Sequence, residues 1–443
     1  MNDMPTQHSP LGRRFLTVWF GQTVSEIGTM LSGIGAAVFV FVETGSATWL
    51  GLLTALAAVP YLVASPFATL IDRYPRRRVM IWADLLAATG PAAALGLASV
   101  GRLEIWHLAL AGFIAGLGNA FQLPASQAAV PALVATEALD RANSLKQLGP
   151  AIGLVAGPFL AAPMVAWWGI EAVLLVDLAT FVVGVLAVLA VRFDDYHDDR
   201  AVADDGSWRL MWAWLSTDGR PLLTLMAATA VVNFVLAFFN VSVIALSADV
   251  AGTAGAGIVL GAGGAAMIAG SVVHAQRGLA PDRVATIMRA LVFMSAGLAT
   301  AALRPGFVLV TAGIAIAFWA VPGVDAATST IFHERVPASM HGRVFALRSL
   351  IGQALRPLGA ALAGVTIARV ATPSITAGGS LHGTLGRIIG TGPERAPAVV
   401  LLACAVVLAA LAAWMRQSCL RSSLHPAPAP SNAVVDNELQ VGA

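Results

Sequence analysis

The sequence predicts an all-α membrane protein with twelve transmembrane helices in two halves of six. Of its 443 residues, 58% are hydrophobic and only 11% are charged, whereas soluble domains carry about 25% charged residues. Apolar runs of roughly 18–25 residues recur along the chain, and such runs can cross a hydrocarbon core about 30 Å thick. A polar, acidic segment near the middle of the chain separates six of these runs from the other six.

The expected spans follow one another with short polar breaks. Several contain Gly and Pro, which membrane helices tolerate because neighbouring helices satisfy the freed backbone groups. The first span is expected to act as its own insertion signal, because the polar stretch before it lacks the apolar core of a signal peptide. The spans cover residues 15–42, 47–71, 79–100, 105–128, 146–168, 170–191, 221–247, 254–276, 284–303, 306–330, 344–370 and 396–416.

Four regions are expected along the chain: a first six-helix bundle (1–195), a cytoplasmic linker (196–220), a second six-helix bundle (221–420) and a disordered, Pro/Ala-rich tail (421–443). The second part of the linker is rich in tryptophan, and its pattern is typical of a short amphipathic helix that lies at the level of the lipid headgroups. Two halves of six spans predict a substrate site between them, near the middle of the membrane.

The distribution of basic residues predicts that both termini lie in the cytoplasm. With that orientation, twenty of the 26 Lys and Arg residues fall on the cytoplasmic side, five fall outside, and Arg356 lies within a span. Cytoplasmic loops of membrane proteins carry such an excess of basic residues. We therefore expect a multi-pass protein of the cell membrane.

A charged stretch between the second and third spans, Ala68–Asp84, reads ATLIDRYPRRRVMIWAD. It resembles the loop between helices 2 and 3 of major facilitator superfamily transporters, in which Asp-Arg precedes a group of basic residues. Ala68 and Pro75 replace the two glycines of the family pattern. The alternative is an arginine cluster that only sets the topology. The resemblance implies a gate at the cytoplasmic end, formed by Asp72, Arg73, Arg76, Arg77 and Asp84.

The fifth span contains the sequence GLVAGPFLAA at residues 153–162. Small residues let helices approach closely, and a proline removes a backbone donor and bends the helix. The segment resembles the antiporter motif of the same superfamily at Gly153, Gly157 and Pro158, with alanines in place of its last two glycines. The resemblance implies proton-coupled export, and ordinary close packing of helices is the alternative.

Three of the acidic side chains within the expected spans are candidates for proton coupling: Glu26, Asp177 and Asp325. An ionised group is costly in hydrocarbon, so each should face the bundle interior or a wet cavity. Loss of water favours the neutral form of a carboxyl group, which can then carry a proton in one state and release it in another. Glu26 is the first candidate for proton coupling, because the first span lines the central cavity in the superfamily. A packing role is the alternative, and Asp325 could instead pair with Arg356.

Amides and aromatic residues within the spans are candidates for the substrate path. Amides can hydrogen-bond a substrate, and aromatic rings provide the apolar surface that an amphipathic molecule needs. Hydrogen bonding between helices is the alternative role for the amides. The candidates are Gln22, Asn119, Gln122, Asn233, Phe234, Asn240 and Trp319.

Three further segments narrow the resemblance: QLPASQAAVPALV (122–134), VPASMHGRVFA (336–346) and GTGPER (390–395). They are similar to segments of the macrolide-efflux and enterobactin-exporter branch of the superfamily. The resemblance extends to about Arg416 and implies a secondary active exporter that exchanges protons for a hydrophobic or amphipathic small molecule. A drug, a siderophore or a nonribosomal-peptide-like metabolite would fit.

Two other functions are open at this point: import of a nutrient or lysolipid on the same fold, and a non-transporting membrane sensor or scaffold. The chain lacks H-E-x-x-H, G-x-S-x-G and Walker-type G-x-x-x-x-G-K motifs, so we expect neither an enzyme nor ATP-driven transport. The expected partners are the lipid bilayer, a small-molecule substrate and protons. We expect no cofactor, metal or nucleic acid, and a monomer.

Overall fold

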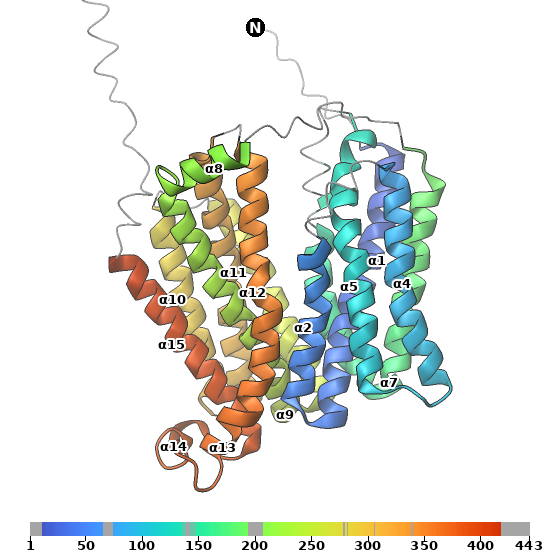
Figure 1. Ribbon diagram of the computed structural model, residues 1–443. Coiled ribbons are helices and arrows are strands. Elements are labelled where there is room, and N and C mark those ends of the chain that lie inside the picture. Colours follow the sequence, from blue (N-terminus) through green and yellow to red (C-terminus); the bar gives the residue numbers. More distant parts are fainter. Residues whose placement is uncertain are drawn as a thin grey trace, which may run out of the picture.

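The computed structural model is almost entirely helical (Figure 1). Ten segments of the described chain are long and apolar enough to cross a membrane, and Ala47–Leu62 is a shorter apolar helix. One of the ten, Val155–Ala190, reverses direction at Gly169, so the chain makes twelve passes, as the sequence predicted. The structure describes residues 11–64, 74–135, 138, 142, 145–146, 148–193, 207–277, 280, 282–304, 306–337 and 340–417.

In the first half, a short 3-10 turn, η2 (Val130–Ala132), follows the fourth pass. α7 folds back at Gly169, whose φ of 76° is readily adopted only by glycine. From the start of α1 toward its end, the residues of the first pass of α7 that it contacts run from 149 to 157. Those of the second pass run the other way, from 187 to 173, so the two passes are antiparallel. The helices of this half are α1 (Arg13–Thr44), α2 (Ala47–Ala64), α4 (Arg76–Ser99), α5 (Ile105–Ala128) and α7 (Leu148–Ala190).

The second half begins with α8 (Ser207–Ser216), a short helix before the seventh pass. α9 (Arg220–Arg277) folds back at Gly252, where φ is 67°. The remaining passes are α10 (Arg283–Ala302), α11 (Phe307–Arg335), α12 (His341–Thr366) and α15 (Ala396–Gln417). Between α12 and α15 lie the π-helical turn η5 (Ile367–Ala371) and three short elements, α13 (Thr372–Ile375), α14 (Gly386–Ile389) and η6 (Pro393–Arg395).

The two groups of helices stand side by side and diverge toward the end that carries α8 (Figure 1). We call this the linker end, and we call the opposite end, with α13 and α14, the loop end. The halves contact each other mainly through two helix pairs, α2 with α12 and α7 with α9.

Small residues bring the halves together at the loop end. Gly51 of α2 lies against the backbone of Ala360 and Gly364 of α12, and Thr48 Oγ1 donates to Gly364 O at 3.4 Å. On the other side, a Cβ on Gly257 of α9 would lie 2.9 Å from the carbonyl oxygen of Pro158 in α7. Larger side chains at these crossings would keep the helices apart. Direct contact between helix backbones therefore closes the loop end.

A glycine repeat on α1 packs against the second pass of α7. Gly21, Gly28 and Gly35 recur every seven residues and therefore share one face of the helix. A Cβ on Gly28 would lie 2.9 Å from Thr180 Cβ, and one on Gly35 would lie 2.8 Å from Val173 Cγ1. This close approach fixes the rotation of α1, and it turns the opposite face toward α4, α5 and the interior.

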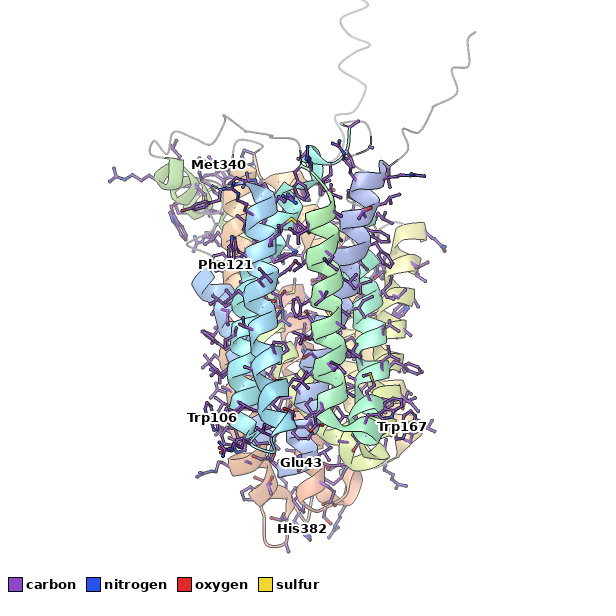
Figure 2. All side chains as sticks on the ribbon, turned by 90° about the vertical axis from the view of Figure 1, so that its right-hand side faces the viewer. Glu43, Trp106, Phe121, Trp167, Met340 and His382 are labelled. Atoms are coloured by element: carbon purple, nitrogen blue, oxygen red, sulfur yellow. The ribbon has the colours of Figure 1, made fainter. Side chains whose placement is uncertain are left out.

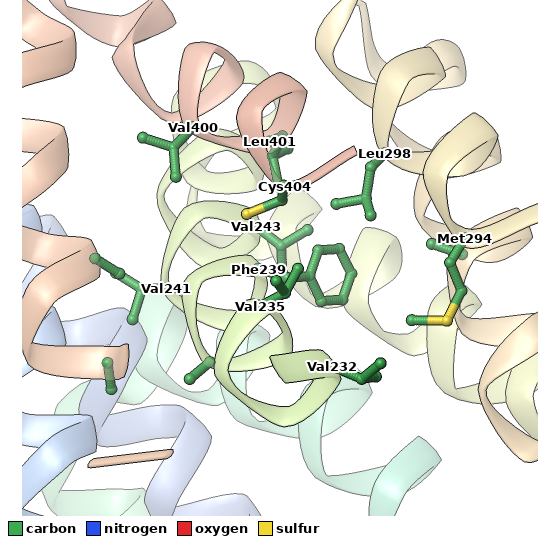
Figure 3. Packing of buried hydrophobic residues seen from close by; sticks show 14 of the residues in the cluster. Val232, Val235, Phe239, Val241, Val243, Met294, Leu298, Val400, Leu401 and Cys404 are labelled. Atoms are coloured by element: carbon green, nitrogen blue, oxygen red, sulfur yellow. The ribbon is translucent and has the colours of Figure 1, made fainter. Parts of the chain in front are cut away.

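The second half encloses an apolar core between α9, α10 and α15 (Figure 3). Phe239 of α9 is 2% exposed and stacks on Phe318 of α11 with ring centroids 5.2 Å apart. α8 adds Met211 and Leu215, both fully buried, to the same core. Further members of this core are Val232, Val235, Met294, Leu298, Leu401 and Cys404.

Exposed aromatic side chains mark the level of the loop end on the outer surface. Trp106 and Trp167 both lie near this end of the first half, and Trp167 is 68% exposed (Figure 2). Trp168 stacks edge-on against Trp167, with centroids 5.8 Å apart. Tryptophans are enriched where a membrane meets water, because their rings are amphipathic. The loop-end boundary of the membrane is therefore expected at this level.

The glycine repeat generates a stability prediction. Gly28→Ala should destabilise the protein by about 1–3 kcal/mol, the usual cost of overpacking, because the new methyl group meets Thr180. Gly96→Ala in α4 is the matched control, since no heavy atom lies within 4 Å of its Cβ position. Thermal unfolding of both variants in detergent checks this, and equal midpoints for Gly28→Ala and the wild type would contradict it.

Candidate functional site: two connected chambers

Two chambers lie inside the molecule. The linker-end chamber, about 470 Å³, is lined by α1, α4, α5 and Lys146, and it extends from Phe15 toward the middle of α1. The inner chamber, about 490 Å³, lies nearer the loop end and includes residues of both halves. Thr29, Tyr61 and Asn119 line both, so the two chambers meet at these side chains.

A chain of three side chains connects three passes at the linker-end chamber. Asp84 of α4 is 2% exposed, and Gln22 Nε2 of α1 donates to its Oδ2 at 2.9 Å. Gln122 Nε2 of α5 donates in turn to Gln22 Oε1. The sequence pattern assigned Asp84 to the gate and the two glutamines to the substrate path. The structure brings the three together in one network, in which the buried carboxylate of Asp84 has a donor.

Glu26 faces the same chamber, opposite a cation. Lys146, just before α7, interacts electrostatically with Glu26. Lys146 Nζ donates to Ser126 Oγ at 2.9 Å. A Cβ on Gly149 would lie 3.0 Å from Glu26 Oε2, so the carboxyl group rests on the glycine at the start of α7. The chamber therefore holds an acid and a base on facing elements.

Asp177 lies at the inner chamber, in the second pass of α7. It is 1% exposed, and Ser32 of α1 hydrogen-bonds its side chain. No described residue donates to its Oδ1. Asn240 of α9 and Arg356 of α12 line the same chamber from the second half.

Asp325 of α11 lies outside the residues that line the two chambers. It interacts electrostatically with Arg348 and with Arg356. Arg356 Nη1 donates to Gln353 Oε1 at 3.0 Å, and within the described ranges no ion pair joins Asp325 to Arg356. Arg348 lies over the ring of Phe332 at 5.0 Å, a cation–π contact. The proposed Asp325–Arg356 ion pair is thus absent from this part of the structure.

Three substrate-path candidates are not among the residues that line either chamber. Asn233 Nδ2 donates to Thr229 O of its own helix at 3.1 Å, and Phe234 packs against α12 at Gly359. Trp319 of α11 packs against two rings inside the second half, those of His274 and Phe293. The other four candidates, Gln22, Asn119, Gln122 and Asn240, do line a chamber.

The basic loop is described only in part. Asp72 and Arg73 lie outside the described residues, whereas Arg76 and Arg77 begin α4. Arg77 donates from Nε to Val188 O at 3.2 Å and from Nη2 to Leu189 O at 2.8 Å. These carbonyls belong to the last turn of α7, where Val188 O also accepts from Val191 N at 3.4 Å. Arg77 therefore ties the start of the third pass to the end of the sixth.

The motif of the fifth span lies between two helices. Gly153 and Gly157 face α1, where a Cβ on Gly157 would lie 3.3 Å from Met30 Cβ. Pro158 contacts Gly257 of α9 through its carbonyl oxygen. The motif therefore joins α1 to the second half at the closed loop end.

Sequence reasoning missed two chamber residues. In the sequence, Lys146 adds to the cytoplasmic positive charge and Tyr61 lies within an apolar run, and neither is among the predicted site residues. Tyr61 interacts electrostatically with Glu26 on one side and with Arg356 on the other. A lysine at the edge of an apolar span and a tyrosine within one were the available signals.

Comparison with known proteins decides the family. The Major Facilitator Superfamily model matches residues 18–360, which is most of the chain. The chain belongs to the major facilitator superfamily. It is a multi-pass membrane transporter and not an enzyme.

Two relatives of this superfamily member are efflux proteins. Macrolide efflux protein A from Streptococcus pyogenes is 26% identical over 364 residues, which cover 81% of this chain and 90% of that protein. Multidrug efflux pump Tap from Mycolicibacterium fortuitum is 25% identical over 374 residues, covering 81% and 89% respectively.

Solved structures with the same fold include other superfamily-like transporters. A bacterial homologue of the iron transporter ferroportin, in its inward-facing state, has a TM-score of 0.68 at 16% identity and covers 93% of this chain and 100% of its own. The nucleoside transporter NupG has a TM-score of 0.67 at 12% identity, with coverage of 92% and 100%. At these identities the likeness concerns the fold alone.

The amide–carboxylate network generates a prediction. Gln22→Leu should destabilise the protein by about 1–3 kcal/mol, because it leaves the buried Asp84 carboxylate without its donor. Gln127→Leu is the control, since Gln127 is exposed in the same chamber. Thermal unfolding in detergent is the measurement, and a Gln22→Leu midpoint equal to that of Gln127→Leu would show that the network does not stabilise the fold.

Proposed function

We propose that this transporter is a secondary active exporter, which moves an amphipathic small molecule out of the cell in exchange for protons. The observation that carries the proposal is the linker-end chamber, where Glu26 faces a cavity between helices and Lys146 lies opposite. A carboxyl group in such a position can bind a proton in one state and release it in another. The names of the two efflux relatives support the direction of transport.

The proposed orientation places the linker end in the cytoplasm. Most of the basic residues of the chain lie on this side under that orientation, in agreement with the positive-inside rule. Arg13, Arg14, Arg76 and Arg77 begin helices at this end. The chamber that contains Glu26 then receives substrate from the cytoplasm, and the loop end faces outward.

In the transport cycle that we propose, the linker end and the loop end open in alternation. In this structure the loop end is closed by the contacts of α2 with α12 and of α7 with α9. Protonation of an acidic residue removes its charge and favours its enclosure by protein. A proton bound at Glu26 would therefore favour the state in which the linker end is closed. Loss of this proton to the cytoplasm, once the linker end has opened, would favour the open state. Asp177 and Asp325 are the further candidates for this proton.

The substrate is proposed to have both apolar and polar parts. Gln22, Asn119, Gln122 and Asn240 supply hydrogen-bonding groups in the chambers, while apolar side chains such as Leu53 and Ile244 line the inner one. A drug, a siderophore or a nonribosomal-peptide-like metabolite fits this description. The protein is proposed to act as a monomer, with Asp72 and Arg73 in the cytoplasmic gate.

Transport into inverted vesicles tests the proposal. With an acidic lumen, vesicles that contain the wild-type protein should accumulate a radiolabelled macrolide or a lipophilic dye, and Glu26→Gln should lose most of this proton-driven accumulation. Glu43→Gln is the matched control, because Glu43 lies on the same helix at the loop end and is exposed (Figure 2).

Two results would count against the proposal. Full proton-driven accumulation by Glu26→Gln would remove Glu26 as the proton carrier and direct attention to Asp177 and Asp325. Absence of accumulation by the wild type at any lumenal pH, together with uptake by intact cells, would favour an importer.

A further inference from the structure

The inner chamber has opposite charges on opposite halves of the protein. Asp177 belongs to the second pass of α7, and Arg356 belongs to α12. The two do not pair with each other in the described structure: Asp177 is hydrogen-bonded by Ser32, and Arg356 Nη1 donates to Gln353 Oε1. The chamber thus separates an acidic group from a basic one.

On the acidic side of the chamber, one oxygen of Asp177 lacks a hydrogen-bond donor. Asp177 is 1% exposed, and its Oδ1 receives no hydrogen bond from any described residue. A buried acceptor without a donor is costly, and native proteins rarely leave one unsatisfied. A ligand in the chamber with an N–H group directed at Asp177 would supply the missing donor.

The basic side of the chamber has donors to spare. A guanidinium group carries five N–H donors in a planar arrangement that matches a carboxylate. The hydrogen bond to Gln353 uses one Nη1 donor of Arg356. The side chain is exposed at the chamber, so the remaining donors can reach a carboxylate or carbonyl group of a ligand.

Apolar side chains also line the chamber. Leu53 of α2, Leu108 of α5 and Leu174 of α7 contribute from the first half, and Ile244 of α9 contributes from the second. The volume of about 490 Å³ admits a small organic molecule. An apolar segment between two polar ends therefore fits this chamber better than a molecule that is polar throughout.

We infer that the inner chamber binds a dipolar amphiphile, with an amino group at Asp177, a carboxylate or carbonyl group at Arg356, and an apolar segment between them. The inference rests on the proposed transport function, for which it names the substrate class. Because the two charged side chains come from different halves, such a ligand bridges the halves.

Binding of simple probes to the full-length protein in lipid nanodiscs tests the inference. Radiolabelled 8-aminooctanoate has both polar ends, octylamine has only the amine, and octanoate has only the carboxylate. The wild type should bind the amino acid about tenfold more tightly than either single-ended probe. Asp177→Asn should remove the advantage over octanoate, and Arg356→Gln should remove the advantage over octylamine. The affinities of longer and shorter amino acids of the same series then report the distance between Asp177 and Arg356.

Matched variants control for charge and folding. Glu171→Gln changes an exposed acid on the same pass as Asp177, and Arg369→Gln changes an exposed arginine that follows α12 in η5. Both should keep the preference for 8-aminooctanoate. If Asp177→Asn fails to fold, the comparison of the three probes on the wild type still decides the inference.

Failure of this inference can be told apart from failure of the proposed function, because binding is measured without a proton gradient. Equal affinity for the three probes, or a preference for the amine alone, would overturn the dipolar assignment even if proton-driven flux is observed. Selective binding of 8-aminooctanoate without proton-driven flux would contradict only the proposed antiport.

Discussion

The close contact between α1 and the two passes of α7 determines where the polar groups of the first half lie. Gly21, Gly28 and Gly35 bring one face of α1 against the second pass of α7, and Gly153 and Gly157 of the first pass meet α1 at Met30. With these faces occupied, Gln22 and Glu26 lie at the chamber instead of at lipid. Ionisable groups in a membrane need such enclosure, because hydrocarbon cannot solvate them.

The same contact connects the chambers to the closed end. The glycines that face α1 are followed by Pro158, which touches α9 of the second half. Movement of the first pass of α7 would therefore act on Glu26, through Gly149, and on the interface between the halves. A rigid element that contacts both sites can couple the proposed proton binding to a change in access.

Much of the fold could be predicted from the sequence, because length and hydrophobicity are enough to locate membrane spans. The twelve passes and the division into two halves were predicted from these quantities. Which residues face a chamber was harder to predict, because the rotation of each helix depends on partners far away in the chain. Gln22 and Asp84 are 62 positions apart, and no local pattern joins them. Trp319 is predicted in the substrate path for its chemistry, and in the structure its ring packs against His274 and Phe293 of the second half.

The central claim is that the two halves exchange access between the linker end and the loop end. Double electron–electron resonance measures this directly, with spin labels at Arg78 and Arg289 for the linker end and at Val100 and Val308 for the loop end, in a background without Cys404 and Cys419. Acidification should shorten the linker-end distance and lengthen the loop-end distance. Distances that do not respond to protons, or that change in the same direction at both ends, would contradict the account.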